Sequence, residues 1–198
     1  MPMPGLREAR KAKTRSALAL AAAEIALEHG TSALTISAIT SGAGVSTRTF
    51  HNYFSSREEA LLEFIVEQVR ILADEVQHLP PNLGLLEISE KLTIITLDAD
   101  GPARLPHLFR LSEMLREKEP GRSYGASDTD IILAPIIEAL APRAATLGFQ
   151  KDELVLAVHL VARSIAFALQ RYESLPAPRD PEVGEYMIHN ALGVIRRL

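Results

Sequence analysis

The segment Leu34–Phe54, LTISAITSGAGVSTRTFHNYF, constrains the fold most strongly because a glycine divides it into two short helical stretches. Thr35 is placed to cap a helix over Ile36–Ala43, which ends at Gly44 because a left-handed backbone costs little without a side chain. Ser46 is placed to cap a second helix, which we expect to end near the last residue of the segment. Two short helices joined by such a turn are typical of a helix-turn-helix.

The two faces of this segment differ in chemistry. One face carries the apolar residues of a small shared core: Ile36, Ile39, Val45, Phe50 and Phe54. The other carries hydrogen-bonding side chains: Thr47, Arg48, Thr49, His51 and Asn52. Arg bonds guanine bidentately and Asn bonds adenine, each discriminating by roughly 1 to 3 kcal/mol, so we expect Arg48 and Asn52 to specify a DNA sequence. Spacing alone fits equally well an ordinary helical hairpin with a solvated polar face.

The rest of the chain also has helical signals, and no segment shows the sustained period-two alternation of a strand. A long helix is expected over Arg7–Glu28, and a capping box at Ser56 and Glu59 opens another that runs to about His78. Further helices are expected over 83–97, 105–117 (interrupted early by Pro106), 127–147 (capped by Ser127, with kinks or breaks at Pro135 and Pro142), 152–172 and 181–197, with a mobile loop over 119–127. The sequence predicts an all-α fold of about nine helices.

Charge is distributed unevenly along the chain. Residues 1–57 contain seven Lys/Arg and three Asp/Glu, a net charge of +4, whereas the remainder carries −8. A basic head on an acidic body is expected when only the head meets phosphate, although a solvated helix face produces the same bias. The basic residues of the first helix are candidates for phosphate or minor-groove contacts: Arg7, Arg10, Lys11, Lys13 and Arg15.

Composition and missing motifs argue against several classes of function. The chain has no cysteine, which excludes disulfides, thiolate metal sites and cysteine nucleophiles. It has no signal-peptide pattern and no apolar run of the roughly 18 residues that a membrane span needs, so a cytoplasmic protein is expected. It also lacks a Gly-rich phosphate loop, a nucleophile elbow and a paired-His motif, so we expect no enzyme and no cofactor.

Three histidines, His107, His159 and His189, could meet in space. A lone His on a helix is more often hydrogen-bonded or exposed than a metal ligand, so no metal is expected.

The motifs LTISAI, GAGVS, RTFHNYF and SSREEALL, in this order between Leu34 and Leu62, resemble the DNA-binding domain of TetR-family repressors. With the preceding helix included, the resemblance covers about 55 residues, and these contain the helix-turn-helix. It implies a DNA-binding domain over 1–56 and a helical domain for ligand binding and dimerisation over 57–198. It further implies that the partner is a double-stranded DNA operator.

The resemblance also implies a set of DNA-binding residues: Thr35, Ser46, Thr47, Arg48, Thr49, His51, Asn52, Tyr53 and Arg57. Thr35 and Ser46 are expected near phosphates, and Arg57 replaces a usual Lys at a helix start that contacts phosphate. The chain departs from the family pattern at Thr40, where Ala is usual, and the order of His51 and Tyr53 is reversed. Either of these two residues could be the one that contacts the DNA backbone.

The last two expected helices, 152–172 and 181–197, carry more apolar surface than a monomer of this size hides easily. We therefore expect a homodimer that forms through these helices as a four-helix interface. Two-fold symmetry would place two recognition helices about 34 to 36 Å apart, so the operator should be a near-palindrome.

Polar residues recur at helical spacing within 152–172, where His159, Arg163 and Gln170 face a polar ligand, the partner subunit or water. If Arg163 reaches a cavity, the expected effector is mainly apolar with an anionic group. The expected effector-binding residues are Phe109, Met114, His159, Arg163 and Phe167. The function expected is a repressor that the effector releases from its operator. Activation is compatible with the same sequence, and the alternative is a helical ligand-binding or adaptor protein that has lost operator binding.

Overall fold

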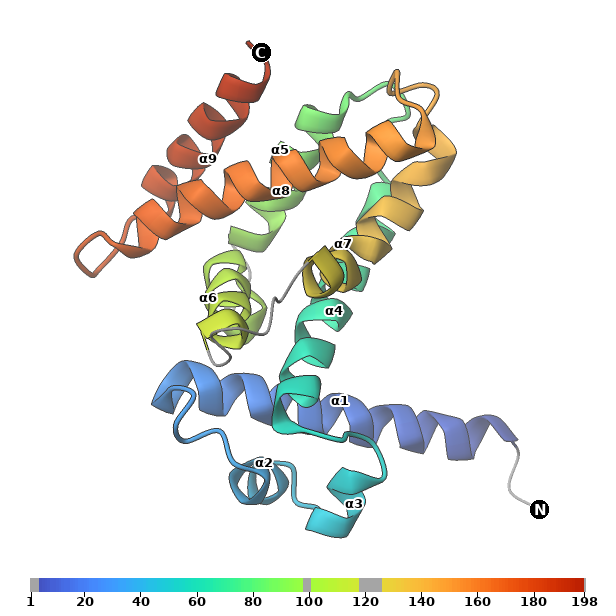
Figure 1. Cartoon of the computed structure of the whole chain (residues 1–198), viewed down its shortest axis with the longest axis vertical. Coiled ribbons are helices and arrows are strands. Elements are labelled where there is room, and N and C mark those ends of the chain that lie inside the picture. The colour runs from blue at the N-terminus through green and yellow to red at the C-terminus, as the bar shows by residue number, and fades with distance from the viewer. Residues whose placement is uncertain (1–3, 98–100, 118–125, 198) are drawn as a thin grey trace. The chain divides into compact units, whose positions relative to one another are not determined.

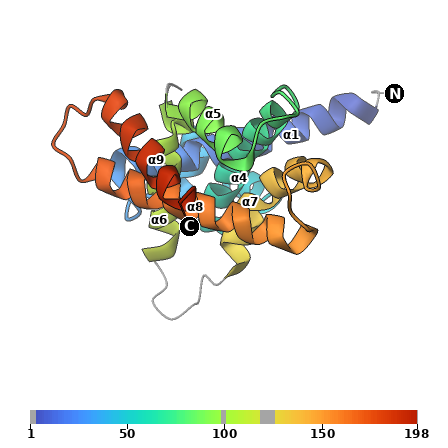
Figure 2. The same cartoon turned by 90° about the horizontal axis from the view of Figure 1, so that it is seen from above.

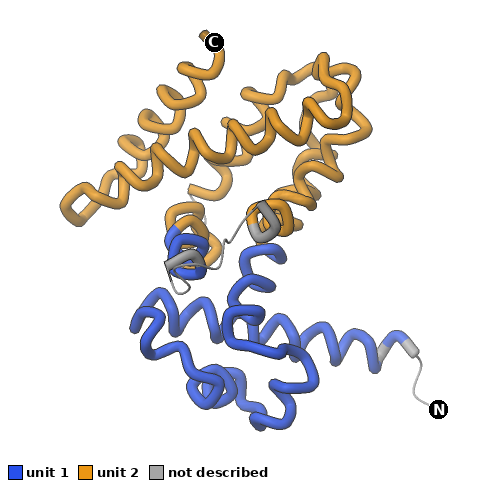
Figure 3. Tube along the Cα trace, in the orientation of Figure 1, with its two compact units in different colours: residues 1–67, 110–123 blue, residues 68–109, 124–198 orange. Residues whose placement is uncertain are grey.

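The computed structural model describes residues 4–97, 101–117 and 126–197. In these ranges it contains nine α-helices, two short 3-10 helices and no strand, which confirms the expected all-α fold (Figure 1). None of the helices described is long and apolar enough to cross a membrane. The chain divides into two compact units, Met1–Glu67 with Arg110–Ser123, and Gln68–Phe109 with Tyr124–Leu198 (Figure 3).

The first unit is built on a long helix rich in alanine. It contains α1 (Pro4–His29), α2 (Ile36–Gly42), α3 (Thr47–His51) and the first part of α4 (Arg57–Val76). Residues 7–28 contain neither Gly nor Pro, and α1 ends where Gly30 adopts a φ of +76°. Small side chains let α2 pack closely on α1, since a Cβ at Gly42 would stand 3.4 Å from the Cβ of Ala21. The glycine that weakens α2 by propensity therefore serves its packing.

Both predicted caps of the helix-turn-helix are confirmed. The Oγ1 of Thr35 accepts a hydrogen bond from the backbone N of Ala38 at 3.1 Å, and Gly44 has a φ of +65° in the turn. The Oγ of Ser46 accepts from the backbone N of Thr49 at 3.1 Å. α3 ends at His51, three residues earlier than predicted, because the chain turns there: the backbone N of Tyr53 donates to the carbonyl of Phe50.

The predicted capping box at the start of α4 is half correct. The Oγ of Ser56 accepts from the backbone N of Glu59 at 3.0 Å, as expected. The Glu59 carboxylate, however, accepts from the backbone N and the hydroxyl of Ser55, both at 2.6 Å, and not from Ser56. Hydrogen bonds from the hydroxyl and then the backbone N of Ser55 lower the pKa of Glu59 below its ordinary value.

The second unit is a bundle in which α8 and α9 lie side by side and α5 packs against both (Figure 2). Its elements are the second part of α4, α5 (Leu85–Leu97), η1 (Gly101–Ala103), the start of α6 (Leu105–Glu117), α7 (Ala126–Leu140), η2 (Ala141–Arg143), α8 (Lys151–Glu173) and α9 (Pro181–Ile195). Its core includes buried aliphatic residues of several helices: Val76, Ile88, Leu97, Leu140, Leu154, Leu169 and Ile188. Asp180 caps α9 by accepting from the backbone N of Glu182, which confirms the predicted start of this helix.

The prolines of this unit differ in their effect on the helices. Pro106 lies in the first turn of α6 and does not interrupt it, since a missing N–H costs nothing there. Pro135 lies inside α7, which continues past it to Leu140. The break predicted at Pro142 is confirmed, because α7 ends at Leu140 and Pro142 lies in the 3-10 helix that follows. α7 begins at Ala126, one residue before the cap predicted at Ser127. Most of the predicted 119–127 loop lies outside the described residues.

Candidate nucleic-acid interface

The polar residues expected to contact DNA surround α3 on the surface of the first unit. Those that are exposed are Thr35, Ser46, Thr47, Arg48, His51 and Asn52, and those that are half-buried are Thr49, Tyr53 and Arg57. The opposite side of α3 is anchored by Phe50, which is fully buried and whose ring lies 5.7 Å from that of buried Phe54. Burial of one face by aromatic packing leaves the other face, with Arg48 and Asn52, open to a partner.

The departures from the family pattern are accommodated without an unpaired polar group. The Thr40 side chain is buried, and its hydroxyl donates to the carbonyl of Ile36 at 2.9 Å, so the extra oxygen is satisfied. His51 is exposed with its ring edge-on to Phe50, whereas Tyr53 is half-buried. The hydroxyls of Ser46 and Thr49 lie 2.8 Å apart, so these two expected contacts are already hydrogen-bonded to each other.

Arg57 is held inside the first unit. Its Nη1 donates to the carbonyl of Leu34 at 2.5 Å, and its Nε donates to the carboxylate of Glu58 at 2.8 Å. The side chain thereby ties the start of α4 to the segment that precedes α2. A phosphate contact by Arg57 stays a prediction.

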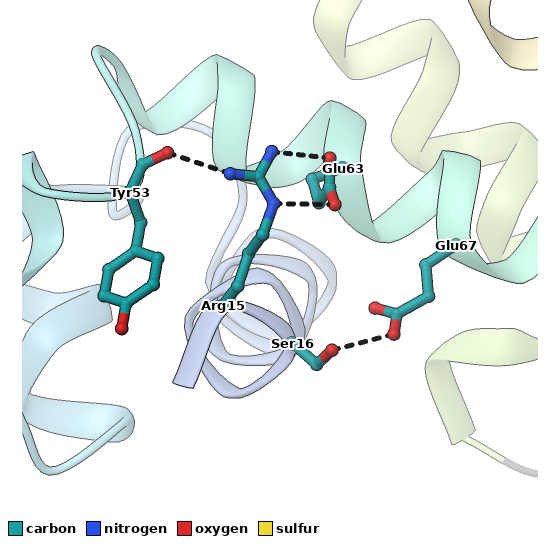
Figure 4. Close-up of polar contacts among 5 residues, drawn as sticks. All are labelled: Arg15, Ser16, Tyr53, Glu63 and Glu67. Carbon is teal, nitrogen blue, oxygen red and sulfur yellow. Dashed lines mark hydrogen bonds and ion pairs between the residues drawn. The ribbon is translucent and has the colours of Figure 1, made fainter. Parts of the chain in front are cut away.

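Arg15, a candidate phosphate ligand by sequence, lies at the centre of a cluster of polar contacts (Figure 4). Its Nε and Nη2 donate to the two oxygens of Glu63, each at 2.8 Å, and its Nη1 donates to the carbonyl of Tyr53 at 3.0 Å. The guanidinium carbon lies 4.6 Å from the centre of the Phe54 ring. The hydrogen bond with Glu63 raises the pKa of Arg15 above its ordinary value, against the effect of burial. Arg15 is therefore charged and internally bonded.

A second contact between α1 and α4 lies one residue further along: the Ser16 hydroxyl donates to Glu67 at 2.8 Å. The sequence does not indicate either contact, because Glu63 and Glu67 are 48 and 51 residues from their partners. The remaining basic residues of α1 are exposed: Arg7, Arg10, Lys11 and Lys13.

In the second unit, α8 and α9 expose several large hydrophobic residues. Their exposed hydrophobic residues, with relative exposures, are Leu156 (61%), Leu160 (54%), Phe167 (60%), Val183 (36%), Tyr186 (67%) and Val194 (50%). Arg163 and Gln170 on α8 are also exposed. Exposed apolar patches mark interaction surfaces in many proteins.

The residues expected to bind an effector lie in different surroundings. His159 is half-buried and its Nε2 lies 3.0 Å from a carboxylate oxygen of Asp130. Phe109 packs against the core of the second unit, whereas Met114 belongs to the part of α6 in the first unit. Phe167 is exposed and lies 6.0 Å from the guanidinium carbon of Arg171.

An apolar groove of about 500 Å³ is present in the second unit. Its walls come from the start of α5, the segment before α8, α8 itself and the end of α9, and the lining residues are Gly84, Leu85, Leu86, Glu87, Leu147, Phe149, Ala157, Leu160, Val161, Ile195 and Arg196. None of the five predicted effector residues lines it. Its volume falls within the range of small-molecule sites, and its lining includes one cation, Arg196, and one anion, Glu87.

The three histidines considered for a metal have separate partners. His107 lies 2.7 Å from the carbonyl of Gly101, His159 pairs with Asp130, and His189 pairs with Glu90. Among the described residues, no three His, Cys, Asp or Glu lie together as a metal site.

Comparison with known proteins agrees with this geometry. Residues 18–64, from the middle of α1 to the first half of α4, match the model of the bacterial regulatory proteins of the tetR family. No curated protein sequence matches the chain. Thirteen solved chains resemble its fold.

Two of these solved structures cover nearly the whole chain. A protein assigned to the TetR family of transcriptional regulators from Mesorhizobium loti has 15% sequence identity and a TM-score of 0.58, over 95% of this chain and 97% of its own. The fatty acid degradation regulator FadR from Bacillus halodurans has 17% identity and a TM-score of 0.58, over 92% of this chain and 96% of its own. The chain therefore resembles the bacterial regulatory proteins of the tetR family over its helix-turn-helix, and it shares the fold of these two solved structures over nearly its whole length.

Proposed function

We propose that the chain is a homodimeric repressor that binds a near-palindromic DNA operator and leaves it when a small-molecule effector binds. The observation that carries the DNA-binding part is the exposed face of α3, where Arg48 and Asn52 stand opposite the buried Phe50. A short helix anchored on one side and polar on the other fits the major groove. Residues 1–56 form the DNA-binding domain in this proposal, and residues 57–198 bind the effector and dimerise.

In the proposed complex, Arg48 and Asn52 read base edges while the surrounding hydroxyls and cations contact phosphates. Thr35 accepts a hydrogen bond from the backbone N of Ala38, which leaves its hydroxyl hydrogen available to a phosphate oxygen. The hydroxyls of Ser46 and Thr49 share one hydrogen bond, so one hydroxyl hydrogen of this pair is available to a phosphate. The exposed cations of α1 (Arg7, Arg10, Lys11 and Lys13) add positive charge to this unit, whereas the charge of Arg15 is paired with Glu63. His51, more exposed than Tyr53, is the better candidate for a backbone contact.

The homodimer is proposed to form through α8 and α9. Their exposed apolar residues would lose contact with water in a four-helix interface, a favourable contribution of about 25 cal/mol for each Å² buried. Phe167 and its neighbours on α8 are then interface residues, while Arg163 on the same helix contacts either the partner or the effector.

The effector is proposed to be an apolar molecule with an anionic group that binds the second unit. Two cations are candidates for that group: Arg163, on the basis of its position in α8, and Arg196, in the lining of the apolar groove. One structural neighbour is described as a regulator of fatty acid degradation, so palmitate is the first probe. Loss of palmitate binding in Arg163→Ala or in Arg196→Ala would identify the cation that binds the anionic group. Unchanged palmitate binding in both variants would exclude both arginines from that role.

Release follows if the effector favours a dimer whose recognition helices do not match the spacing of the grooves. By linkage, the operator must then weaken effector binding by the same factor. This reciprocity can be measured with the effector once it is known.

Selection of genomic fragments on the purified protein tests the proposed function, with Arg48→Ala and Asn52→Ala as comparison variants. The proposal predicts recovery of an inverted repeat, with affinity reduced about tenfold or more by either change and with relaxed preference at the contacted bases. Enrichment of no fragment at any salt concentration would favour the helical ligand-binding or adaptor protein. Such a protein would keep effector binding in both variants.

A further inference from the structure

Arg15 joins three elements of the first unit through one side chain. It belongs to α1, it pairs bidentately with Glu63 of α4, and it donates to the carbonyl of Tyr53 in the turn that follows α3 (Figure 4). The end of α3 is therefore connected to α4 through hydrogen bonds of 3.0 Å and 2.8 Å on the same guanidinium. Carbonyls at the end of a helix have no partner within the helix, and Arg15 supplies one for this turn.

The geometry of this contact requires an arginine. A guanidinium is planar and presents its donors in a fixed fork, so two donors on Glu63 determine the direction of the third. The Phe54 ring, 4.6 Å from the guanidinium carbon, supports the group from another side. A lysine at this position would keep the charge but lose the fixed relation between the Glu63 carboxylate and the Tyr53 carbonyl.

We propose that Arg15 is a positioning residue for operator recognition, which holds the end of α3 in register with α1 and α4 and does not itself bind phosphate. The proposal rests on the proposed function, in which α3 enters the major groove. A helix that presents only five residues depends on its surroundings for its orientation. A small rotation of α3 would move Arg48 and Asn52 off their base edges while leaving the charge of the head unchanged.

Charge and positioning predict opposite effects for Glu63. Glu63→Gln removes a negative charge from the DNA-binding unit and frees Arg15 from its ion pair, so a purely electrostatic role of Arg15 predicts tighter DNA binding. A positioning role predicts weaker operator binding, because the Gln amide has one oxygen in place of the two that accept the hydrogen bonds Arg15 donates to Glu63. The two accounts therefore differ in sign.

The experiment measures the affinity of the full chain for a recovered operator and for unrelated DNA, as a function of salt. Arg15→Gln and Glu63→Gln are each expected to weaken operator binding about tenfold, the double variant no more than either single variant, and the salt slope to stay as in the wild type. Ser16→Ala is the matched control, because Ser16 also bonds α4 at 2.8 Å but makes no described contact with the turn after α3. It is expected to bind operator as the wild type does.

Three results would overturn the proposal. One is tighter operator binding by Glu63→Gln, and another is operator affinity restored to the wild-type value in Arg15→Lys. The third is a salt slope reduced by about one in Arg15→Gln, with the same loss of affinity for unrelated DNA as for the operator. A melting temperature within a few degrees of the wild type shows that each variant is folded. Amide hydrogen exchange in residues 47–54 provides a readout without DNA: it should rise in Arg15→Gln and not in Ser16→Ala. Equal exchange in both variants would contradict positioning even if no operator were found, whereas failure to find one refutes the proposed function alone.

Discussion

The two units differ in what they leave on their surface. The first unit buries its phenylalanine rings, caps its short helices with hydroxyls and joins its elements through Arg15, and the face around α3 is polar. The second unit has an aliphatic core but leaves Leu156, Phe167 and Tyr186 more than half exposed. The first surface fits a polar partner such as DNA, and the second fits an apolar partner such as a second copy of the chain.

The largest expected effect comes from a pair of identical substitutions, one in each unit. Phe50→Ala removes a fully buried ring and should destabilise the first unit by about 3 to 5 kcal/mol. Phe167→Ala removes a ring that is 60% exposed and should leave the stability of the isolated chain almost unchanged. Denaturant unfolding of both variants at low protein concentration makes the measurement. Equal losses would mean that the two surfaces do not differ as described.

A charge on the apolar face tests the second unit directly. Leu156→Glu should weaken dimerisation by about 100-fold, since it places a charge in a desolvated interface. Ile95→Glu on α5, at an exposed position outside α8 and α9, is the control and should dimerise normally. Sedimentation equilibrium measures the dimerisation of both variants. A Leu156→Glu dimer as tight as the wild-type dimer would show that this face is not the dimer interface.

A cap in the first unit has a smaller effect on stability. Ser46→Ala removes the acceptor of the Thr49 backbone N and should cost about 1 kcal/mol. Ser41→Ala, at an exposed position in α2, should change stability by less than half of that. Thermal unfolding of the two variants provides the comparison, and a Ser46 variant as stable as the Ser41 variant would show that the cap contributes nothing.

The smallest expected effect is a pH dependence at Glu59. Because its hydrogen bonds with Ser55 lower the folded-state pKa below the ordinary value of 4.5, the ionised group stabilises the folded state above that pH. The stabilisation is lost as the pH falls from 4.5 through the folded-state pKa. The difference in unfolding free energy between wild type and Glu59→Gln should therefore shrink in acid. A difference independent of pH would contradict this.

Local sequence signals predicted much of the fold. The caps at Thr35, Ser46 and Asp180 and the turn at Gly44 are confirmed because each depends on residues three positions apart or fewer. The predicted end of α3 was wrong. The helix ends earlier because the rest of the unit determines both the burial of the aromatic rings and the turn at Tyr53.

The candidate site was predictable in part. Polar residues with helical spacing marked the face that carries Arg48 and Asn52. The internal role of Arg15 was not predictable, because its partner lies 48 residues away and a basic residue near a helix start serves equally well on a surface. The five effector residues were chosen by type and spacing, and no short-range signal says which face of α8 points inward.

The division of labour between the units is tested most directly by a hydroxyl-radical footprint of the wild-type protein on a recovered fragment, together with the stoichiometry of the complex. The account predicts two protomers bound to one inverted repeat, with two protected patches about one helical turn of DNA, or a multiple of it, apart. A single protected patch with one bound protomer would contradict it.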